Sequence, residues 1–159
     1  ILSQMPQVKY VTVPISGGGL LGGVSAAMAR AGAGRGIKVY GIEPELASDA
    51  YQSFKAGRIV ALPAEETGRT IADGLRVAQI GDIPWEHIKE FVHDMATVSE
   101  EEIRACVRRV ALEAHLVAEP SGAVSVAGAL KLGLPPAQTV CVLSGGNLDL
   151  ESYAEILRG

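Results

Sequence analysis

Residues 13–23 read VPISGGGLLGG, a glycine-rich loop between a short apolar run and an alanine-rich run. Three consecutive glycines let the backbone curl so that successive N–H groups point at one anion. A helix that begins near Leu20 would direct the positive end of its dipole at the same point. The segment therefore predicts a strand, a phosphate-binding loop and a helix in succession, unless the loop is only a tight turn that packs the helix on the strand.

The rest of the chain repeats this alternation of apolar runs and helical patterns. Ser99 and Glu102 match a capping box, which starts one helix at residue 100. Short apolar strands that alternate with helices are typical of a parallel sheet covered on both faces. The sequence therefore predicts an α/β fold of three layers, an open, mostly parallel sheet with helices on both faces. Strands are expected at residues 10–15, 37–42, 95–98 and 139–143, and helices at 20–33, 47–56, from 100, from 120 and at 150–157, with no regular pattern between 57 and 94.

The composition suits one packed domain. Of the 159 residues, 48% are hydrophobic and 20% are charged, and the formal net charge is −4. No cluster of basic residues is present, so nucleic acid is not expected as a partner. No apolar run reaches the roughly 18 residues of a membrane span, and the chain has no basic region followed by an apolar one, so no signal peptide is expected. We therefore expect no membrane partner and a cytoplasmic location.

The cysteines and histidines give no sign of a catalytic or metal centre. Cys106 and Cys141 lie in apolar surroundings and are expected to pack as small hydrophobic side chains. His87, His93 and His115 have no ligand spacing, and no catalytic role is assigned to them.

The glycine loop also fits a dinucleotide fingerprint. Gly17, Gly19 and Gly22 satisfy G-x-G-x-x-G, and Glu43 follows Gly22 by about 20 residues, where an acid would bind a ribose hydroxyl. This pattern favours a nicotinamide-dependent oxidoreductase. The triple glycine instead suits a terminal phosphate monoester, and no Walker lysine follows the loop.

A second glycine loop distinguishes these interpretations. Residues 144–147 read SGGN and follow the last apolar run, so they should lie at the same sheet edge as the first loop. A dinucleotide site does not need this second loop. Glu119 opens the preceding helix, although it and Ser144 could also act only as helix-end residues. With one phosphate bound by residues 17–20, Gly22 and Gly23 are expected to serve close helix packing.

Five segments, in order, resemble the serine/threonine dehydratase family, which includes serine racemases. They are VPISGGGLLGG, GIEPELASDAYQS, TIADGL, EEIRACVRRVALEAHLVAEPSGAV and VCVLSGGNLDL. The family consists of pyridoxal-phosphate (PLP) enzymes with the tryptophan synthase β-like fold. The resemblance spans nearly all 159 residues. It implies a single domain, the C-terminal part of the large cofactor-binding domain, in which the N-terminal segment and the small domain are absent.

The resemblance also implies a role for particular residues. The backbone donors to the cofactor phosphate are expected to be Gly17, Gly18, Gly19 and Leu20. The hydroxyl of Ser144 is expected to lie at the pyridine nitrogen. Glu119 and Gly74 are expected to line the pocket. A neutral hydroxyl does not protonate the pyridine nitrogen as an acid would, which favours β-elimination over transamination. Family members with a divalent cation have ligands that resemble Glu43, the carbonyl of Ala47 and Asp49. Such oxygen ligands suit Mg²⁺ or Ca²⁺, although a carboxylate pair is also common on solvated surfaces.

The Schiff-base lysine of the family is not found. None of Lys9, Lys38, Lys55, Lys89 and Lys131 lies in a Ser-x-Lys-x-Arg-like motif. The parent protein is expected to be an oligomeric L-serine/L-threonine dehydratase, acting on a small amino acid, and this chain alone is expected to be inactive. Serine racemase activity, a nicotinamide-dependent oxidoreductase and a non-catalytic binding role remain alternatives.

Overall fold

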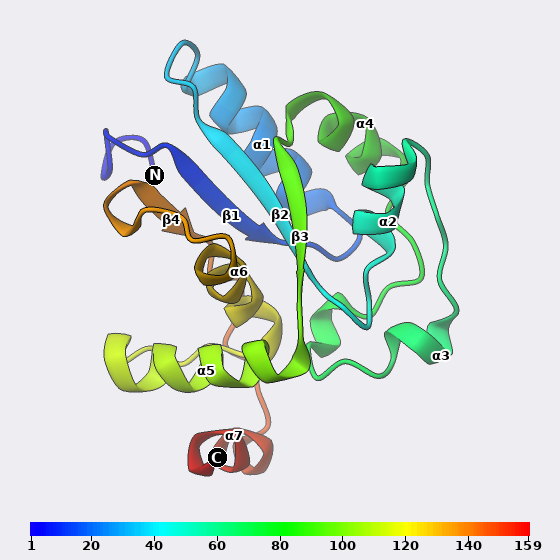
Figure 1. Ribbon diagram of the computed structural model, residues 1–159, viewed down its shortest axis with the longest axis vertical. Coiled ribbons are helices and arrows are strands. Elements are labelled where there is room, and N and C mark those ends of the chain that lie inside the picture. The colour runs from blue at the N-terminus through cyan, green and yellow to red at the C-terminus, as the bar shows by residue number, and fades with distance from the viewer.

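The computed structural model describes residues 1–159 and contains one sheet of four parallel strands. The strands are β1 (Tyr10–Pro14), β2 (Lys38–Pro44), β3 (Asp94–Val98) and β4 (Thr139–Cys141), and their order in the sheet is β3-β2-β1-β4. β1 therefore lies between its successor in the chain, β2, and the last strand, β4 (Figure 1). The expected strand 139–143 is shorter than predicted, although Val142 still donates a 2.9 Å hydrogen bond to Thr12 of β1.

Seven helices and two 3₁₀ turns connect and flank the strands. They are α1 (Gly19–Ala31), α2 (Asp49–Ala56), α3 (Ala64–Thr67), η1 (Asp73–Leu75), α4 (Asp82–Phe91), α5 (Glu100–Ala114), α6 (Pro120–Lys131), η2 (Pro136–Gln138) and α7 (Leu150–Arg158). The sequence pattern did not predict α4. Its buried residues Trp85 and Ile88, with Val92 at its C-cap, have helical spacing, and Pro84 suits a first turn. None of the seven helices combines the length and the apolar character of a transmembrane span.

The sheet separates two hydrophobic cores, which confirms the three-layer fold. Along β1, Val11 and Val13 belong to a core shared with α1, α2 and α4, whereas Ile42 and Val98 belong to the core on the other face. α5 and α6 cover that second face, and α7 packs against α5 on the side away from the sheet (Figure 1). Successive strand residues point to opposite faces, so the buried residues at successive positions of β1 and β2 contribute to both sides of the sheet.

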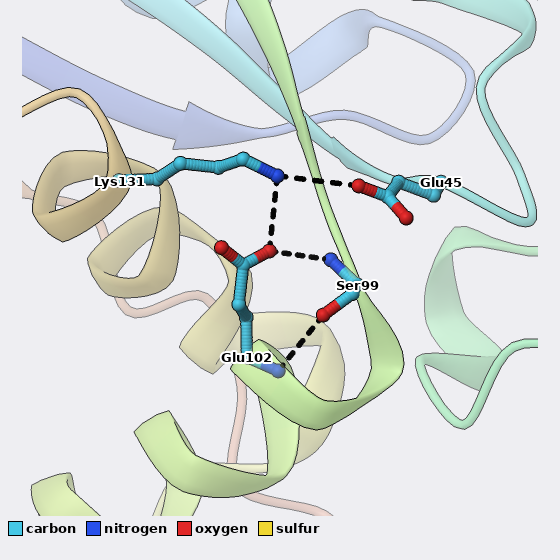
Figure 2. Close-up of polar contacts among 4 residues, drawn as sticks. All are labelled: Glu45, Ser99, Glu102 and Lys131. Atoms are coloured by element: carbon cyan, nitrogen blue, oxygen red, sulfur yellow. Dashed lines mark hydrogen bonds and ion pairs between the residues drawn. The ribbon is translucent and has the colours of Figure 1, made fainter.

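The predicted capping box at the start of α5 is present. Ser99 Oγ accepts the N–H of Glu102 at 3.2 Å, and Glu102 Oε2 accepts the N–H of Ser99 at 2.7 Å (Figure 2). The same Glu102 oxygen lies 3.1 Å from Nζ of Lys131, which also reaches Glu45 Oε1 at 3.2 Å. These contacts tie the end of α6 to the start of α5 and to the segment after β2.

Only one of the two glycines assigned to helix packing has that role. A Cβ atom on Gly22 would lie 3.3 Å from Cβ of His87 on α4, so Gly22 permits the close approach of α1 and α4. Gly23 is exposed and has no atom within 4 Å of such a Cβ position. The prediction for Gly23 was wrong, because the helix turn places neighbouring residues about 100° apart and Gly23 faces solvent.

Candidate functional site

The glycine loop and the SGGN loop meet at one edge of the sheet. The first loop follows β1 and the second follows β4, and these two strands are parallel neighbours paired from Tyr10–Thr139 to Thr12–Cys141. β2 leaves β1 on the opposite side, so the β1–β4 boundary is the point where the strand order reverses. Open α/β sheets bind ligands in the crevice beyond the carboxyl ends of the strands at such a point.

A cavity of about 220 Å³ occupies this crevice. All seven residues expected to bind a cofactor line it, namely Gly17, Gly18, Gly19, Leu20, Gly74, Glu119 and Ser144. Four further lining residues were not predicted, namely Pro14, Ser16, Leu75 and Ser121. Ser16 and Ser121 stand within or beside the quoted motifs, and their hydroxyl groups were the signal that could have identified them.

The backbone of the glycine loop is arranged to receive an anion. Gly18 is the N-cap of α1 with φ 88°, and a Cβ there would lie 2.9 Å from both Ile80 and Pro84. Only glycine adopts this conformation without strain. The N–H groups of Gly17, Gly18, Gly19 and Leu20 donate to no other backbone group, and no acidic residue occupies the first turn of α1. Unpaired donors at a helix N-terminus form an anion site.

Glu119 holds the SGGN loop in place. Its N–H donates to the carbonyl of Gly145 at 3.2 Å, and its Oε2 accepts the N–H of Asn147 at 3.0 Å. Gly145 has φ 147°, and a Cβ there would lie 2.5 Å from Glu119 Oε1. Glu119 thus fixes the backbone from the Gly145 carbonyl to Asn147, directly after Ser144, which lines the cavity.

Gly74 reaches the cavity from η1. Its N–H donates to Ser121 Oγ at 3.0 Å, and a Cβ on Gly74 would lie 3.1 Å from the same oxygen. Gly74 and Ser121 therefore close one wall of the cavity by direct contact between the η1 turn and the start of α6.

Glu43, Ala47 and Asp49 lie apart from this cavity, buried between β2 and α2. The Glu43 carboxylate accepts the N–H of Tyr51 at 2.7 Å and that of Ala50 at 3.3 Å. Burial, with the nearby charge of Asp49, raises the pKa of Glu43 well above its usual range. Burial also raises the pKa of Asp49 to about 6. A buried acid engaged with α2 does not reach a ribose hydroxyl at the glycine loop, which removes the main support for a dinucleotide.

Two of the three expected cation ligands, Glu43 and Asp49, are side chains, and the third is the backbone carbonyl of Ala47. The chain has no group of three or more His, Cys, Asp or Glu side chains that could hold a metal ion. Both carboxylate oxygens of Asp49 are buried and lack a hydrogen bond of ordinary geometry, although the backbone amides of Asp49 and Ile80 lie near enough to oppose the rise in its pKa. These orphaned oxygens fit a hard cation, whose remaining ligands would be Glu43, the Ala47 carbonyl and water.

None of the five lysines lines the 220 Å³ cavity. Lys55 pairs with Asp94, Lys89 with Glu86, and Lys131 with Glu45 and Glu102. The cavity thus offers donors for a phosphate and a hydroxyl group but no amine nucleophile.

Both cysteines are free thiols, and Cys106 is buried in the core beneath α5. Burial raises the pKa of Cys106 to about 12, so this thiol stays protonated and packs as an apolar group, as expected.

Comparison with known proteins finds a family model and relatives that match most of the chain. A family model described as "Pyridoxal-phosphate dependent enzyme" matches residues 1–145. L-threo-3-hydroxyaspartate ammonia-lyase of Saccharomyces cerevisiae is 37% identical over 161 aligned positions, which cover 100% of this chain and 48% of the relative. Serine racemase of Schizosaccharomyces pombe is 40% identical over 159 positions, which cover 99% of this chain and 48% of the relative.

A solved structure has the same fold. Serine racemase of maize matches with a TM-score of 0.85 and 34% identity, covering 99% of this chain and 48% of that chain. The chain spans about half the length of the curated relatives it matches.

Proposed function

Because the chain belongs to the pyridoxal-phosphate dependent enzymes, we propose that its 220 Å³ cavity binds PLP and that the protein is an L-serine/L-threonine ammonia-lyase. The reaction is the β-elimination of water, which ends in a 2-oxo acid and ammonia. Relatives named as ammonia-lyases support this reaction.

One observation carries the proposal. Three segments far apart in the sequence, at Gly17–Leu20, Gly74 and Ser144, converge on one cavity, and the first of them presents four amides without backbone acceptors. A terminal phosphate needs several donors at one point, and the nitrogen of a pyridine ring needs a hydrogen-bonding group, such as a hydroxyl, at the other end. The cavity supplies both.

Different residues of the cavity bind different parts of the cofactor. The amides of residues 17–20 and the N-terminus of α1 hold the phosphate dianion. Ser144 offers a hydroxyl at the pyridine nitrogen, and Glu119 keeps Ser144 there through its hydrogen bonds to the SGGN loop. When bound, PLP supplies the electron sink that makes elimination possible. A hydroxyl leaves that nitrogen unprotonated, which disfavours transamination.

The phosphate site is tested by a charge change that the fold tolerates. A Cβ on Gly19 meets no atom within 4 Å, and an acid in the first helical turn stabilises a helix. Gly19→Asp should therefore fold but repel a phosphate, and Gly19→Asn is its neutral control. The probe is pyridoxine 5′-phosphate, which has no aldehyde and cannot react with surface lysines. We expect calorimetry to show at least roughly tenfold weaker binding for Gly19→Asp than for Gly19→Asn, because a repelled charge costs about 1.4 kcal/mol or more. Equal affinities would place the phosphate elsewhere.

The positions of the lysines yield a second test. Residues 1–159 mixed with L-threonine and PLP should form no 2-oxobutanoate above the rate of free PLP, since no amine lines the cavity. Turnover above that rate would contradict the inactivity of this chain.

Serine racemase is the alternative supported by a relative at 40% identity. The cavity residues described here are common to both proposals, so only products separate them. With a chain that carries the amine nucleophile, L-serine should yield mainly pyruvate if the ammonia-lyase proposal is right and mainly D-serine if the protein is a racemase.

A divalent cation at Glu43, the Ala47 carbonyl and Asp49 is a subsidiary proposal. The orphaned, buried oxygens of Asp49 favour it. Titration with CaCl₂ or MgCl₂ should release or absorb heat with the natural protein and not with Asp49→Asn. Absence of heat in the natural protein would contradict the cation site.

A further inference from the structure

A second cavity, of about 330 Å³, shares the lining residue Glu119 with the 220 Å³ cavity. Its walls come from the η1 segment, α5, the chain after the SGGN loop and α7, and α5 and α7 lie against each other (Figure 1). Ligand pockets for drug-sized molecules span about 300–1,000 Å³. The volume of this cavity suits a small molecule.

Two opposite charges face this cavity without a partner. Arg104 on α5 and Glu155 on α7 both line it. Neither side chain takes part in any of the five salt bridges of the chain, nor in any of its side-chain hydrogen bonds. Arg104 and Glu155 are therefore free to bind one anionic and one cationic group.

Each of the other charged groups at the cavity makes a hydrogen bond within the chain, and that of Glu119 is to the N–H of Asn147. Arg76 donates from Nε to the carbonyl of Thr70 at 2.9 Å. Asp149 Oδ1 accepts the N–H of Ser152 at 2.8 Å as the N-cap of α7. Asp73 Oδ1 accepts the N–H of Gly74 at 2.9 Å.

Apolar surface completes the lining. Ile71 and Leu148 border the cavity, and the ring of Tyr153 packs against the core below it. A ligand that satisfies all these groups carries a carboxylate, an ammonium and a short apolar side chain.

We propose that this cavity binds a free α-amino acid, with its carboxylate at Arg104, its ammonium at Glu155 and its side chain toward Ile71 and Leu148. The inference does not depend on the ligand of the cofactor cavity. Asn147 borders the second cavity and donates to Glu119, which lines both cavities. A bound amino acid therefore contacts the segment that positions Ser144.

The test uses three probes of similar shape. L-Valine has both charged groups, isovalerate lacks the amine and isobutylamine lacks the carboxylate, and none of them can lose a β-hydroxyl. In ¹H–¹⁵N NMR titrations of the protein without PLP, L-valine should shift the amides of Asn147 and Ser152. The other two probes should bind at least roughly tenfold more weakly, the loss expected for one charge-assisted hydrogen bond.

Two charge-removing variants assign the ends of the ligand. Arg104→Gln should weaken L-valine and isovalerate roughly tenfold without affecting isobutylamine, and Glu155→Gln should weaken L-valine and isobutylamine only. Arg109→Gln is the matched control, because Arg109 lies on the same helix, pairs with Glu113 and does not line the cavity. No shift with L-valine, or equal affinity in Arg104→Gln and Arg109→Gln, would overturn the proposal. Pyridoxine 5′-phosphate binding should be unchanged in all three variants.

Discussion

Gly18 is a strongly constrained position in the backbone that lines the 220 Å³ cavity. Its φ of 88° turns the chain from β1 into α1 and leaves the next amides free to face the cavity. The neighbouring Gly17 has no such requirement, because its φ is not positive and a Cβ there meets no atom within 4 Å. These two residues, adjacent in one motif, should thus respond differently to the same substitution.

Gly18→Ala should destabilise the protein, whereas Gly17→Ala should be nearly neutral. A left-handed alanine costs about 1–2 kcal/mol, and contacts of 2.9 Å with Ile80 and Pro84 add to that cost. Urea unfolding at neutral pH measures both variants against the natural protein. A loss for Gly17→Ala as large as that for Gly18→Ala would show that side-chain volume near the loop, and not backbone conformation, determines its stability.

At the scale of elements, the glycines in the helices determine how closely the helices pack against one another and against the sheet. α1 meets α4 at Gly22, and α6 crosses the sheet with Gly128 against Ile42. Glycines at such positions have a packing reason, whereas an exposed glycine in a helix only adds flexibility to the unfolded chain.

Gly23→Ala should stabilise the protein by about 0.5–1 kcal/mol, the difference in helix propensity between the two residues. Gly22→Ala should gain less or lose stability, because its Cβ would lie 3.3 Å from Cβ of His87 and 3.6 Å from the carbonyl of Pro84. The two variants form a matched pair on one helix, compared by thermal and urea unfolding. Equal gains would mean that α1 and α4 separate easily at Gly22.

The Glu102 carboxylate at the start of α5 should make the stability of the protein depend on pH. Burial raises the pKa of Glu102, but the hydrogen bonds from Ser99 and Lys131 outweigh it and hold the pKa below its ordinary value of 4.5. Because the folded pKa is lowered, this stabilisation is present above pH 4.5 and is lost as the pH falls through the folded value.

Glu102→Gln should retain the acceptor for Ser99 and lose the charge, which is worth less than about 1 kcal/mol for a pair this exposed. Glu102→Ala should also lose the reciprocal cap, about 1 kcal/mol more. The difference in free energy of unfolding between the natural protein and Glu102→Gln should shrink on acidification toward pH 3. A difference that stays constant with pH would contradict this role for the Glu102 charge.

At the scale of the whole molecule, much apolar surface and both sheet edges are open. β3 and β4 each have one neighbouring strand. Large apolar side chains are exposed on several elements, among them Ile83 at 77% and Leu150 at 78%. Open edges and apolar patches favour association with further protein.

We therefore predict that the chain forms homo-oligomers whose fraction rises with concentration. Sedimentation velocity over a concentration series measures this, and association driven by apolar surface should weaken on cooling. A monomer at all concentrations, or association that strengthens on cooling and disappears with salt, would contradict the prediction.

Local chemistry was enough to predict much of this protein. The period of apolar residues predicted four strands and five of the longer helices, and the triple glycine and SGGN predicted two loops that line one cavity. These features depend on residues close in the chain. α4 was missed because its helical spacing is short and interrupted by the exposed Ile83 and by Pro84.

Only the tertiary structure showed which strands and helices lie next to one another. Pairing of β4 with β1 brings Ser144 to Gly17, and burial of Glu43 against α2 removes it from the glycine loop. The meeting of Arg104 and Glu155 in one cavity depends on how α7 packs on α5. Strand order and helix docking follow from burying apolar faces that are distant in sequence, and no local pattern records which distant face will be chosen.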